Sequence, residues 1–307
     1  MRTLSRLPLG GRLVKLVLLV LCFGVAFAVV FMVGRALEGS SRPKATAPGE
    51  GTIAYGSSAG IHLVGADGMG LKRLTSGWDD DPAWSPDGRR IAFTRLVGGR
   101  GQIWVMSSDG RGLRRLTSGR FSSHHPTWSP DGRRIAFEQD TARRDGTVGI
   151  YVMSSDGRGV RRLVASRAYD VRPEWSPDGR RIAFQRGLDT IFVVGADGRG
   201  LHRIAVGGDK PTWSPDGRRI AFEGTIRVAG HPSVAVFVAA ADGSSRRLLR
   251  TGFAQPAWSP DGRNLAVFRQ LATDLGAIYV MRVDGRGPVR LVASGPYAES
   301  PAWARRV

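Results

Sequence analysis

The strongest constraint on the fold is a twelve-residue unit that recurs in a fixed register. It reads Pro-x-Trp-Ser-Pro-Asp-Gly-Arg-Arg-Ile-Ala-Phe. Four copies begin at Pro82, Pro126, Pro173 and Pro211, a looser copy spans 256–268, and a truncated copy covers 301–303. Successive tryptophans of the unit are 44, 47, 38, 45 and 45 residues apart. A period near 40–45 residues is typical of propeller blades, each a four-stranded β-sheet.

Each unit divides into four predicted strands. In the first copy, residues 82–84 begin the first strand and residues 90–93 form the second. The turn between them is Ser-Pro-Asp-Gly, in which Pro presets φ, Asp bonds back to the backbone and Gly accepts a positive φ. Residues 103–106 and 113–116 form the third and fourth strands, on either side of an Asp-Gly turn. We therefore interpret the repeated Asp as turn residues and the repeated Trp as packing between blades.

The two ends of the chain complement each other. Residues 52–75 supply second, third and fourth strands but no Pro-x-Trp strand, which the C-terminal copy at 301–303 supplies. Joining these segments completes a sixth blade and leaves no free sheet edge between blades. The sequence predicts an all-β, six-bladed β-propeller over residues 52–307, closed by pairing of the N- and C-terminal strands.

These motifs resemble the propeller repeats of the TolB family, a branch of the WD-like repeats. The resemblance covers residues 52–303 and includes the long signature Pro-x-Trp-Ser-Pro-Asp-Gly-x-x-Ile-Ala-Phe. It implies a propeller at the cell envelope. Members of that family carry an α/β domain before the propeller, whereas here an apolar segment and a short linker occupy that place.

Residues 16–34 contain no charged side chain, and 19 residues are close to the number needed to cross a bilayer as a helix. Basic residues precede the segment, which favours a cytoplasmic N-terminus. We predict a short basic cytoplasmic segment at 1–15, a transmembrane signal-anchor helix at 16–34 and a linker at 35–51. The propeller would then be extracytoplasmic, in a periplasmic position. Cleavage after Ala28 is the alternative, since Ala26-Phe27-Ala28 resembles a signal-peptidase site.

Cysteine and charge add two limits. Cys22 is the only cysteine and lies within the apolar segment, so no disulfide forms within the chain. The formal net charge of +19 favours an anionic partner, although many arginines are copied with the repeat. The turns after the first and third strands fall on one face of a propeller, and we predict that this face meets an anionic membrane. Its foremost candidates are Arg111, Arg158 and Arg199. An extracytoplasmic position argues against nucleic acid as the partner.

The residues before each Pro-x-Trp strand differ from blade to blade. Innermost strands line the central channel of a propeller, so these segments should surround one mouth of it. The candidate ligand- or partner-binding residues are Asp80, Asp81, His124, His125, Arg172, Asp209, Lys210 and Glu299. A solvated rim of mixed charge and a metal site that uses a histidine with Asp80 or Asp81 remain as alternatives.

No catalytic motif occurs in a suitable setting. Residues 56–60 match G-x-S-x-G but lie between two predicted propeller strands, whereas a nucleophile elbow needs a strand–turn–helix context. We predict a monomeric, non-enzymatic interaction module without cofactor or metal, whose partner is an envelope protein or peptide. The alternative is a propeller enzyme, a polysaccharide lyase or hydrolase with its site at the channel mouth.

Overall fold

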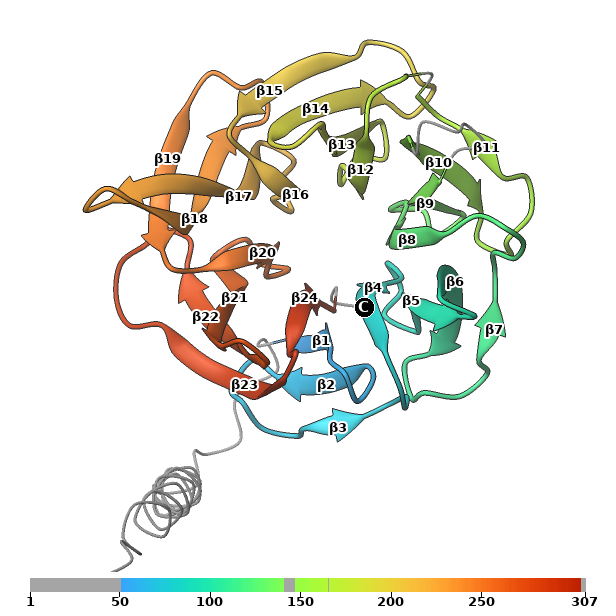
Figure 1. Cartoon of the computed structure of the whole chain (residues 1–307), viewed down its shortest axis with the longest axis horizontal. Helices are drawn as coiled ribbons and strands as arrows, with labels where there is room; N and C mark the ends of the chain where they lie inside the picture. Colours follow the sequence, from blue (N-terminus) through green and yellow to red (C-terminus); the bar gives the residue numbers. More distant parts are fainter. Residues whose placement is uncertain (1–50, 141–146, 165, 305–307) are drawn as a thin grey trace, which may run out of the picture. The chain divides into compact units, whose positions relative to one another are not determined.

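The computed structural model describes residues 51–140, 147–164 and 166–304. These residues form six antiparallel four-stranded sheets, arranged as blades around a central axis (Figure 1). The predicted all-β, six-bladed fold is therefore confirmed. No helix in these ranges is long and apolar enough to cross a bilayer. The segments predicted at 1–15 and 16–34 lie outside the described residues, as does the predicted linker at 35–51 except for Gly51.

The strands follow the predicted order within each blade, from the channel outwards. Innermost are β4 (Asp79–Trp84), β8 (Ser123–Trp128), β12 (Asp170–Trp175), β16 (Asp209–Trp213), β20 (Ala254–Trp258) and β24 (Glu299–Trp303). Second are β5 (Arg90–Val97), β9 (Arg134–Asp140), β13 (Arg181–Arg186), β17 (Arg219–Val228), β21 (Asn264–Ala272) and β1 (Thr52–Gly56). Third are β6 (Arg100–Ser107), β10 (Val148–Ser154), β14 (Thr190–Gly195), β18 (His231–Ala240), β22 (Leu275–Arg282) and β2 (His62–Gly65). Outermost are β7 (Arg114–Arg115), β11 (Arg161–Arg162), β15 (His202–Val206), β19 (Arg246–Thr251), β23 (Arg290–Pro296) and β3 (Lys72–Arg73).

One blade joins both ends of the chain, as predicted. Its sheet order is β24-β1-β2-β3, and Ile53 pairs with Trp303 in its register. Both side chains are buried in a cluster that includes Ile278 and Val280 of the preceding blade. The closing strand thus contributes to the core as well as to the sheet.

The core lies between neighbouring blades. The repeated Phe93, Phe137, Phe184 and Phe222 of the second strands are fully buried. Three of the repeated tryptophans connect adjacent innermost strands through hydrogen bonds. Nε1 of Trp128 donates to the carbonyl oxygen of Ala83 at 3.1 Å, that of Trp213 to Glu174 at 3.2 Å, and that of Trp258 to Thr212 at 3.2 Å. This confirms the packing role expected for the repeated indoles.

The Ser-Pro-Asp-Gly turns are held by side-chain hydrogen bonds. In the first copy, the Ser85 hydroxyl donates to Oδ1 of Asp87 at 2.5 Å, and the Arg89 amide donates to the same oxygen at 3.1 Å. The bond from Ser85 is the main cause that lowers the pKa of Asp87. Since these contacts recur in the other copies, the turn role of the repeated Asp is confirmed.

Many of the repeated arginines serve the fold. In each of the four complete copies of the repeat, the second arginine after the Ser-Pro-Asp-Gly turn stacks on the tryptophan of the next blade, as Arg90 does on Trp128 at 4.5 Å. Three further pairs repeat this contact: Arg134 with Trp175, Arg181 with Trp213 and Arg219 with Trp258. On the outermost strands, Arg114 donates to the Asp156 carbonyl oxygen of the next blade at 2.8 Å. Part of the excess positive charge is therefore used in contacts between blades.

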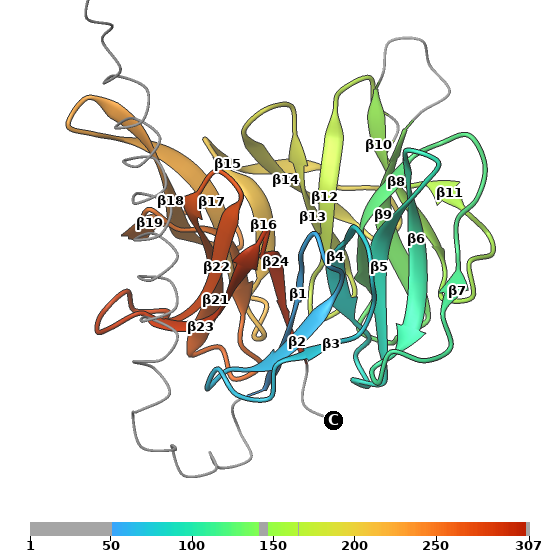
Figure 2. The ribbon, with the colours of Figure 1, turned by 60° about the horizontal axis from the view of Figure 1, so that its bottom comes forward.

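The two ends of the propeller differ. One end, the turn face, carries the short Ser-Pro-Asp-Gly and Asp-Gly turns. The other, the mouth face, carries the hairpins between second and third strands and the connections between blades. Figure 2 shows the long β17–β18 hairpin extending from the mouth face. Gly51, where the described chain begins, lies on the turn face beside Pro260.

Candidate functional site

One residue in each innermost strand, directly before the repeated proline, has a positive φ. The six residues are Asp81, His125, Arg172, Lys210, Gln255 and Ser300, with φ between 49° and 54°. Each coincides with a register shift against the second strand. A left-handed backbone is uncommon for residues other than glycine, and a bulge redirects a side chain. The same backbone geometry therefore presents six different side chains at the channel mouth.

This geometry refines the sequence interpretation. The innermost strands begin three residues earlier than predicted in the first copy, at Asp79 and not at Pro82. The mouth residues consequently belong to the strands, and their positions are fixed by the sheet.

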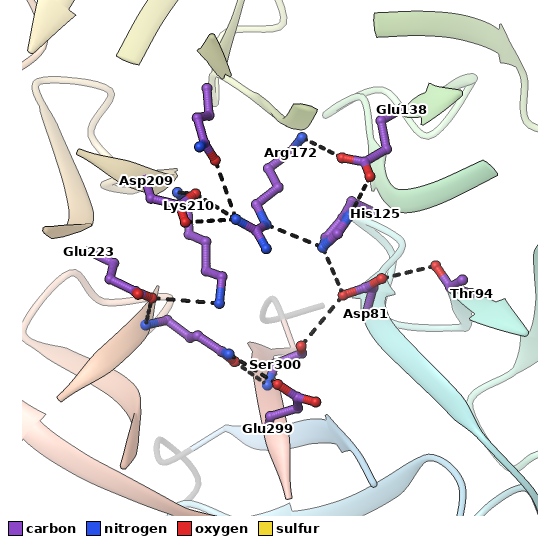
Figure 3. Close-up of polar contacts among 12 residues, drawn as sticks. Asp81, Thr94, His125, Glu138, Arg172, Asp209, Lys210, Glu223, Glu299 and Ser300 are labelled. Carbon is purple, nitrogen blue, oxygen red and sulfur yellow. Dashed lines mark hydrogen bonds and ion pairs between the residues drawn. The ribbon is translucent and has the colours of Figure 1, made fainter. Parts of the chain in front are cut away.

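His125 lies between two carboxylates (Figure 3). Its Nε2 is 3.2 Å from Oδ1 of Asp81, and its Nδ1 is 3.1 Å from Oε1 of Glu138. Burial acts to lower the pKa of His125, but Asp81 and Glu138 outweigh it and raise the value to about 9. His125 is therefore protonated at neutral pH and connects the blade of β4 to the blade of β8 and β9.

The basic residues of the mouth are paired as well. Nη1 of Arg172 lies 2.7 Å from both carboxylate oxygens of Asp209, and the Arg172 amide donates to Glu138 at 2.8 Å. Nζ of Lys210 is 3.6 Å from Oε2 of Glu223. Both cations are thus neutralised by partners at the same level of the channel.

Gln255 and Ser300 complete a circle of contacts. The backbone N–H of Gln255 donates to Oε2 of Glu223 at 3.3 Å, and the side-chain Nε2 of Gln255 donates to Oε2 of Glu299 at 3.2 Å. Ser300 donates its backbone N–H to Oε1 of Gln255 at 2.6 Å, and its hydroxyl lies 3.5 Å from Oδ1 of Asp81. Sequence reasoning missed Glu138 and Glu223, whose only local signal is a carboxylate directly after the buried Ile-Ala-Phe run.

Asp80 has a different environment. Its side chain packs against Gly56 of β1, where a Cβ atom would collide with Oδ1. This Oδ1 is buried and has no hydrogen-bond partner among the described residues. Burial, followed by the negative charges of Asp81 and Glu299, raises the pKa of Asp80 to about 7. The mouth therefore contains a carboxyl group whose ionisation is opposed by its surroundings.

The side chains of the mouth surround a cavity of 780 Å³. It extends along the channel to Pro177, Pro215 and Pro260 of the Ser-Pro-Asp-Gly turns. Seven of the eight predicted mouth residues line it, and the eighth, Asp209, holds Arg172. Two exposed aromatic residues, Trp78 and Tyr297, also line it, with ring centroids 5.1 Å apart. The arrangement can accept a side chain or a short segment of a partner.

The two mouth histidines have separate partners. Nε2 of His124 lies 2.9 Å from the Ser122 hydroxyl, whereas His125 bridges Asp81 and Glu138. Their ring centroids are 6.4 Å apart. Across residues 51–140, 147–164 and 166–304, no group of three or more His, Cys, Asp or Glu is placed to hold a metal ion.

The mouth has a net negative charge within a chain of formal charge +19. Nine of its ionisable residues are called the mouth ring, which leaves out His124: Asp80, Asp81, His125, Glu138, Arg172, Asp209, Lys210, Glu223 and Glu299. Six are carboxyl groups and three are basic. The net charge of the mouth is therefore opposite in sign to that of the chain as a whole.

The fold and the channel define a β-propeller with a polar, variable mouth. A family model described as the TolB beta propeller domain matches residues 51–145 and 118–307. The chain belongs to this TolB propeller family, as the repeat indicated.

Individual proteins extend this comparison. The Tol-Pal system protein TolB of Rhizorhabdus wittichii is 44% identical over 48 residues, which are 15% of this chain and 11% of that protein. TolB from Acinetobacter baumannii has a TM-score of 0.72 at 23% identity, over 83% of this chain and 67% of that one. An oligogalacturonate lyase from Vibrio parahaemolyticus has a TM-score of 0.54 at 12% identity, over 75% and 70%. At these identities, the two solved structures show a shared fold alone.

Proposed function

We propose that the protein is a membrane-anchored, extracytoplasmic interaction module that binds an envelope protein or peptide at its mouth face and is not an enzyme. The main support is the contrast between the two faces. The turn face repeats the same residues, whereas the mouth face presents six different side chains on one repeated backbone bulge. Variable side chains on a rigid frame are typical of a binding surface. The TolB named among the relatives is a Tol-Pal system protein, which is consistent with an envelope partner.

The exposed apolar side chains support the same face. Ten of the seventeen large apolar residues exposed in the described chain belong to mouth-face hairpins and connections. They are Trp78, Leu96, Val97, Tyr169, Leu188, Val206, Val228, Leu271, Leu275 and Tyr297. Apolar surface that surrounds a polar cavity fits a protein or peptide partner, because its burial on binding is favourable.

We propose that the turn face faces the membrane. Residues 16–34 would serve as the membrane anchor, with the N-terminus in the cytoplasm. Gly51 enters on this face, and nine turn arginines are exposed on it. They are Arg89, Arg111, Arg133, Arg158, Arg180, Arg199, Arg218, Arg263 and Arg286. A basic side chain near an anionic leaflet gains about 1 kcal/mol, and less where a turn carboxylate lies beside it. Asp109, for example, is 3.7 Å from Arg111.

Site-specific photo-crosslinking in cells tests the proposed binding face. A photoreactive residue at Leu188, which is 94% exposed on the mouth face, should capture an envelope protein. The matched probe at Arg199, on the turn face of the same blade, should not capture that protein. Equal capture from both positions, or none from Leu188 and the other mouth-face positions, would contradict the proposal. No observation in the described residues favours the alternative of a lyase or hydrolase.

A further inference from the structure

Four consecutive blades carry an exposed apolar residue at the same point of the turn face. Each is the fourth residue after the aspartate of an Asp-Gly turn and directly precedes the outermost strand, and the four are between 41% and 63% exposed. They are Leu71, Leu113, Val160 and Leu201. The strands that follow them, β3, β7, β11 and β15, succeed one another around the ring (Figure 1). Together with Met69, which is exposed in the first of these turns, we call them the apolar arc.

The four turns have the same shape. In each, the backbone N–H of the second residue after the aspartate donates to the aspartate carboxylate at 2.9–3.0 Å. The glycine that follows has φ between 65° and 70°, a conformation that other residues rarely adopt. Because the backbone is the same, the apolar residue after this glycine lies at the same level in all four blades.

Hydrogen bonds between blades join these turns to one another. The residue after each of the first three apolar side chains is basic, and it donates to a backbone carbonyl oxygen in the turn of the next blade at 2.8–3.5 Å. The three donors are Lys72, Arg114 and Arg161. The apolar arc is therefore a continuous edge of the propeller and not a set of unrelated exposed side chains.

The surroundings of the apolar arc are basic. The four segments that contain it, 67–73, 109–115, 156–162 and 197–203, carry four aspartates and nine exposed lysine and arginine side chains. Those nine are Lys72, Arg73, Arg111, Arg114, Arg115, Arg158, Arg161, Arg199 and Arg203. The edge that presents the apolar residues thus has a net positive charge.

The position of the apolar arc relates it to the predicted anchor. The arc begins in the blade of β1, and Gly51, directly before β1, lies on the turn face. Only 16 residues separate Gly51 from the end of the apolar segment at 16–34. The other two blades have Arg246 and Pro288 where the arc has its apolar residues. One side of the turn face is therefore distinguished from the other.

A membrane surface fits this combination better than a second copy of the chain. Basic residues beside apolar side chains are typical of interfacial membrane binding, to which the buried apolar area and the attraction of anionic lipids both contribute. A second copy would bring like charges together, since the formal charge of each chain is +19.

We propose that the apolar arc inserts into the headgroup region of an anionic membrane and tilts the propeller towards these four blades. The inference rests on the proposed orientation of the turn face. It deepens that orientation, because it names the side chains that enter the lipid.

Fluorescence quenching in lipid nanodiscs tests the insertion. The full-length protein carries Cys22→Ala, which removes its only cysteine, and one new cysteine labelled with a nitrobenzoxadiazole fluorophore. The nanodiscs contain phosphatidylcholine, phosphatidylglycerol and a phospholipid with a nitroxide on its acyl chain. A label at Leu113→Cys should be quenched, and its emission should shift to shorter wavelength. The matched label at Pro288→Cys, at the equivalent exposed position outside the apolar arc, should show neither effect.

Substitutions test whether the other members of the apolar arc hold the label in the lipid. With the label at Leu201→Cys, the triple variant Leu71→Ser, Leu113→Ser and Val160→Ser should lose most of the quenching. All three positions are exposed, so its Tm should be unchanged. Leu188→Ser, on the mouth face, is the control and should leave the quenching as it was. Nanodiscs of phosphatidylcholine alone should weaken it, because the attraction to anionic lipid is lost.

Equal quenching at Leu113→Cys and Pro288→Cys, or none at either, would overturn the inference. Unchanged quenching in the triple variant would overturn it as well. Two other results would instead refute the proposed function: a protein that does not remain in the nanodiscs has no anchor, and stronger quenching of a label at Leu188→Cys reverses the orientation. A protein that remains in the nanodiscs and still captures its partner from Leu188, with no quenching at Leu113→Cys, would refute the insertion alone.

Discussion

Replacing Asp80 by Asn should stabilise the protein at alkaline pH and not at acidic pH. The pKa of Asp80 is raised from 3.8 to about 7, chiefly by burial. The folded chain therefore holds this proton at pH values where the unfolded chain has lost it. By linkage, the contribution of Asp80 to stability falls as the pH rises from about 4 to about 7 and stays low above that.

The magnitude follows from the shift. From 3.8 to about 7 corresponds to at most about 4 kcal/mol, at about 1.4 kcal/mol per pKa unit. We expect a gain of about 1–3 kcal/mol for Asp80→Asn at pH 8, because the amide removes the buried charge but still occupies the space beside Gly56. At pH 4 the variant should be equal to the native protein or less stable.

Urea denaturation of both proteins at pH 4, 6 and 8 measures the difference. Asp81 on the same strand, Glu299 on β24 and His125 on β8 are the charged groups that act on Asp80, and they are present in both proteins. Their own titration therefore largely cancels in the comparison. Asp189→Asn, at an exposed position, is the control and should show no dependence on pH. A stability difference for Asp80→Asn that is the same at pH 4 and pH 8 would refute the reasoning.

Three further predictions concern closure, anchoring and orientation. Ending the chain at Ser300 removes the buried Trp303 and three of the five residues of β24. By analogy with large-to-small core changes, this truncation should cost about 3–5 kcal/mol of stability. An unchanged Tm in calorimetry would contradict closure. An alkaline phosphatase reporter fused after Val307 should be active as an exported enzyme, and removal of residues 1–38 should release the protein from membranes; full-length protein in the soluble fraction would refute anchoring. The protein lacking residues 1–38 should bind anionic liposomes weakly and lose them at high salt. Reversal of Arg111, Arg158 and Arg199 to Glu should abolish that binding and Asp80→Asn should not, so equal loss from both would contradict the orientation.

The architecture was predictable because its information is local and repeated. The Ser-Pro-Asp-Gly turn, the buried Ile-Ala-Phe run and the Asp-Gly turn each define an element within a few residues. The split blade followed from the same repeat. Residues 52–75 supply three of its strands, and the C-terminal strand that contains Trp303 supplies the fourth.

The site was predictable only in part. The positions of the mouth residues followed from their place before the repeated proline, but their partners did not. His125 bridges Asp81 of one blade and Glu138 of another, and Arg172 pairs with Asp209 across a blade boundary. Such pairings depend on how the blades pack around the axis. This packing cannot be predicted from any short stretch of the sequence. The left-handed bulge at Asp81 and its equivalents likewise has no local signal beyond the proline that follows it.

The charge of the chain illustrates the same limit. The excess of arginine in the sequence suggests a basic protein surface. Arg90 and its equivalents instead stack on tryptophans of the neighbouring blade. The mouth is net acidic although the chain is basic. The stacking depends on the packing of neighbouring blades, and the charge of the mouth depends on which residues of the six innermost strands face the channel.

Hydrogen–deuterium exchange of the protein with its crosslink-identified partner tests the central claim most directly. Binding at the mouth face should slow exchange in residues 94–102 and 226–232, which include the β5–β6 and β17–β18 hairpins. The turns at 85–88 and 214–217 in the same blades should exchange at unchanged rates. Protection of the turns with no change in the mouth-face hairpins would contradict the account.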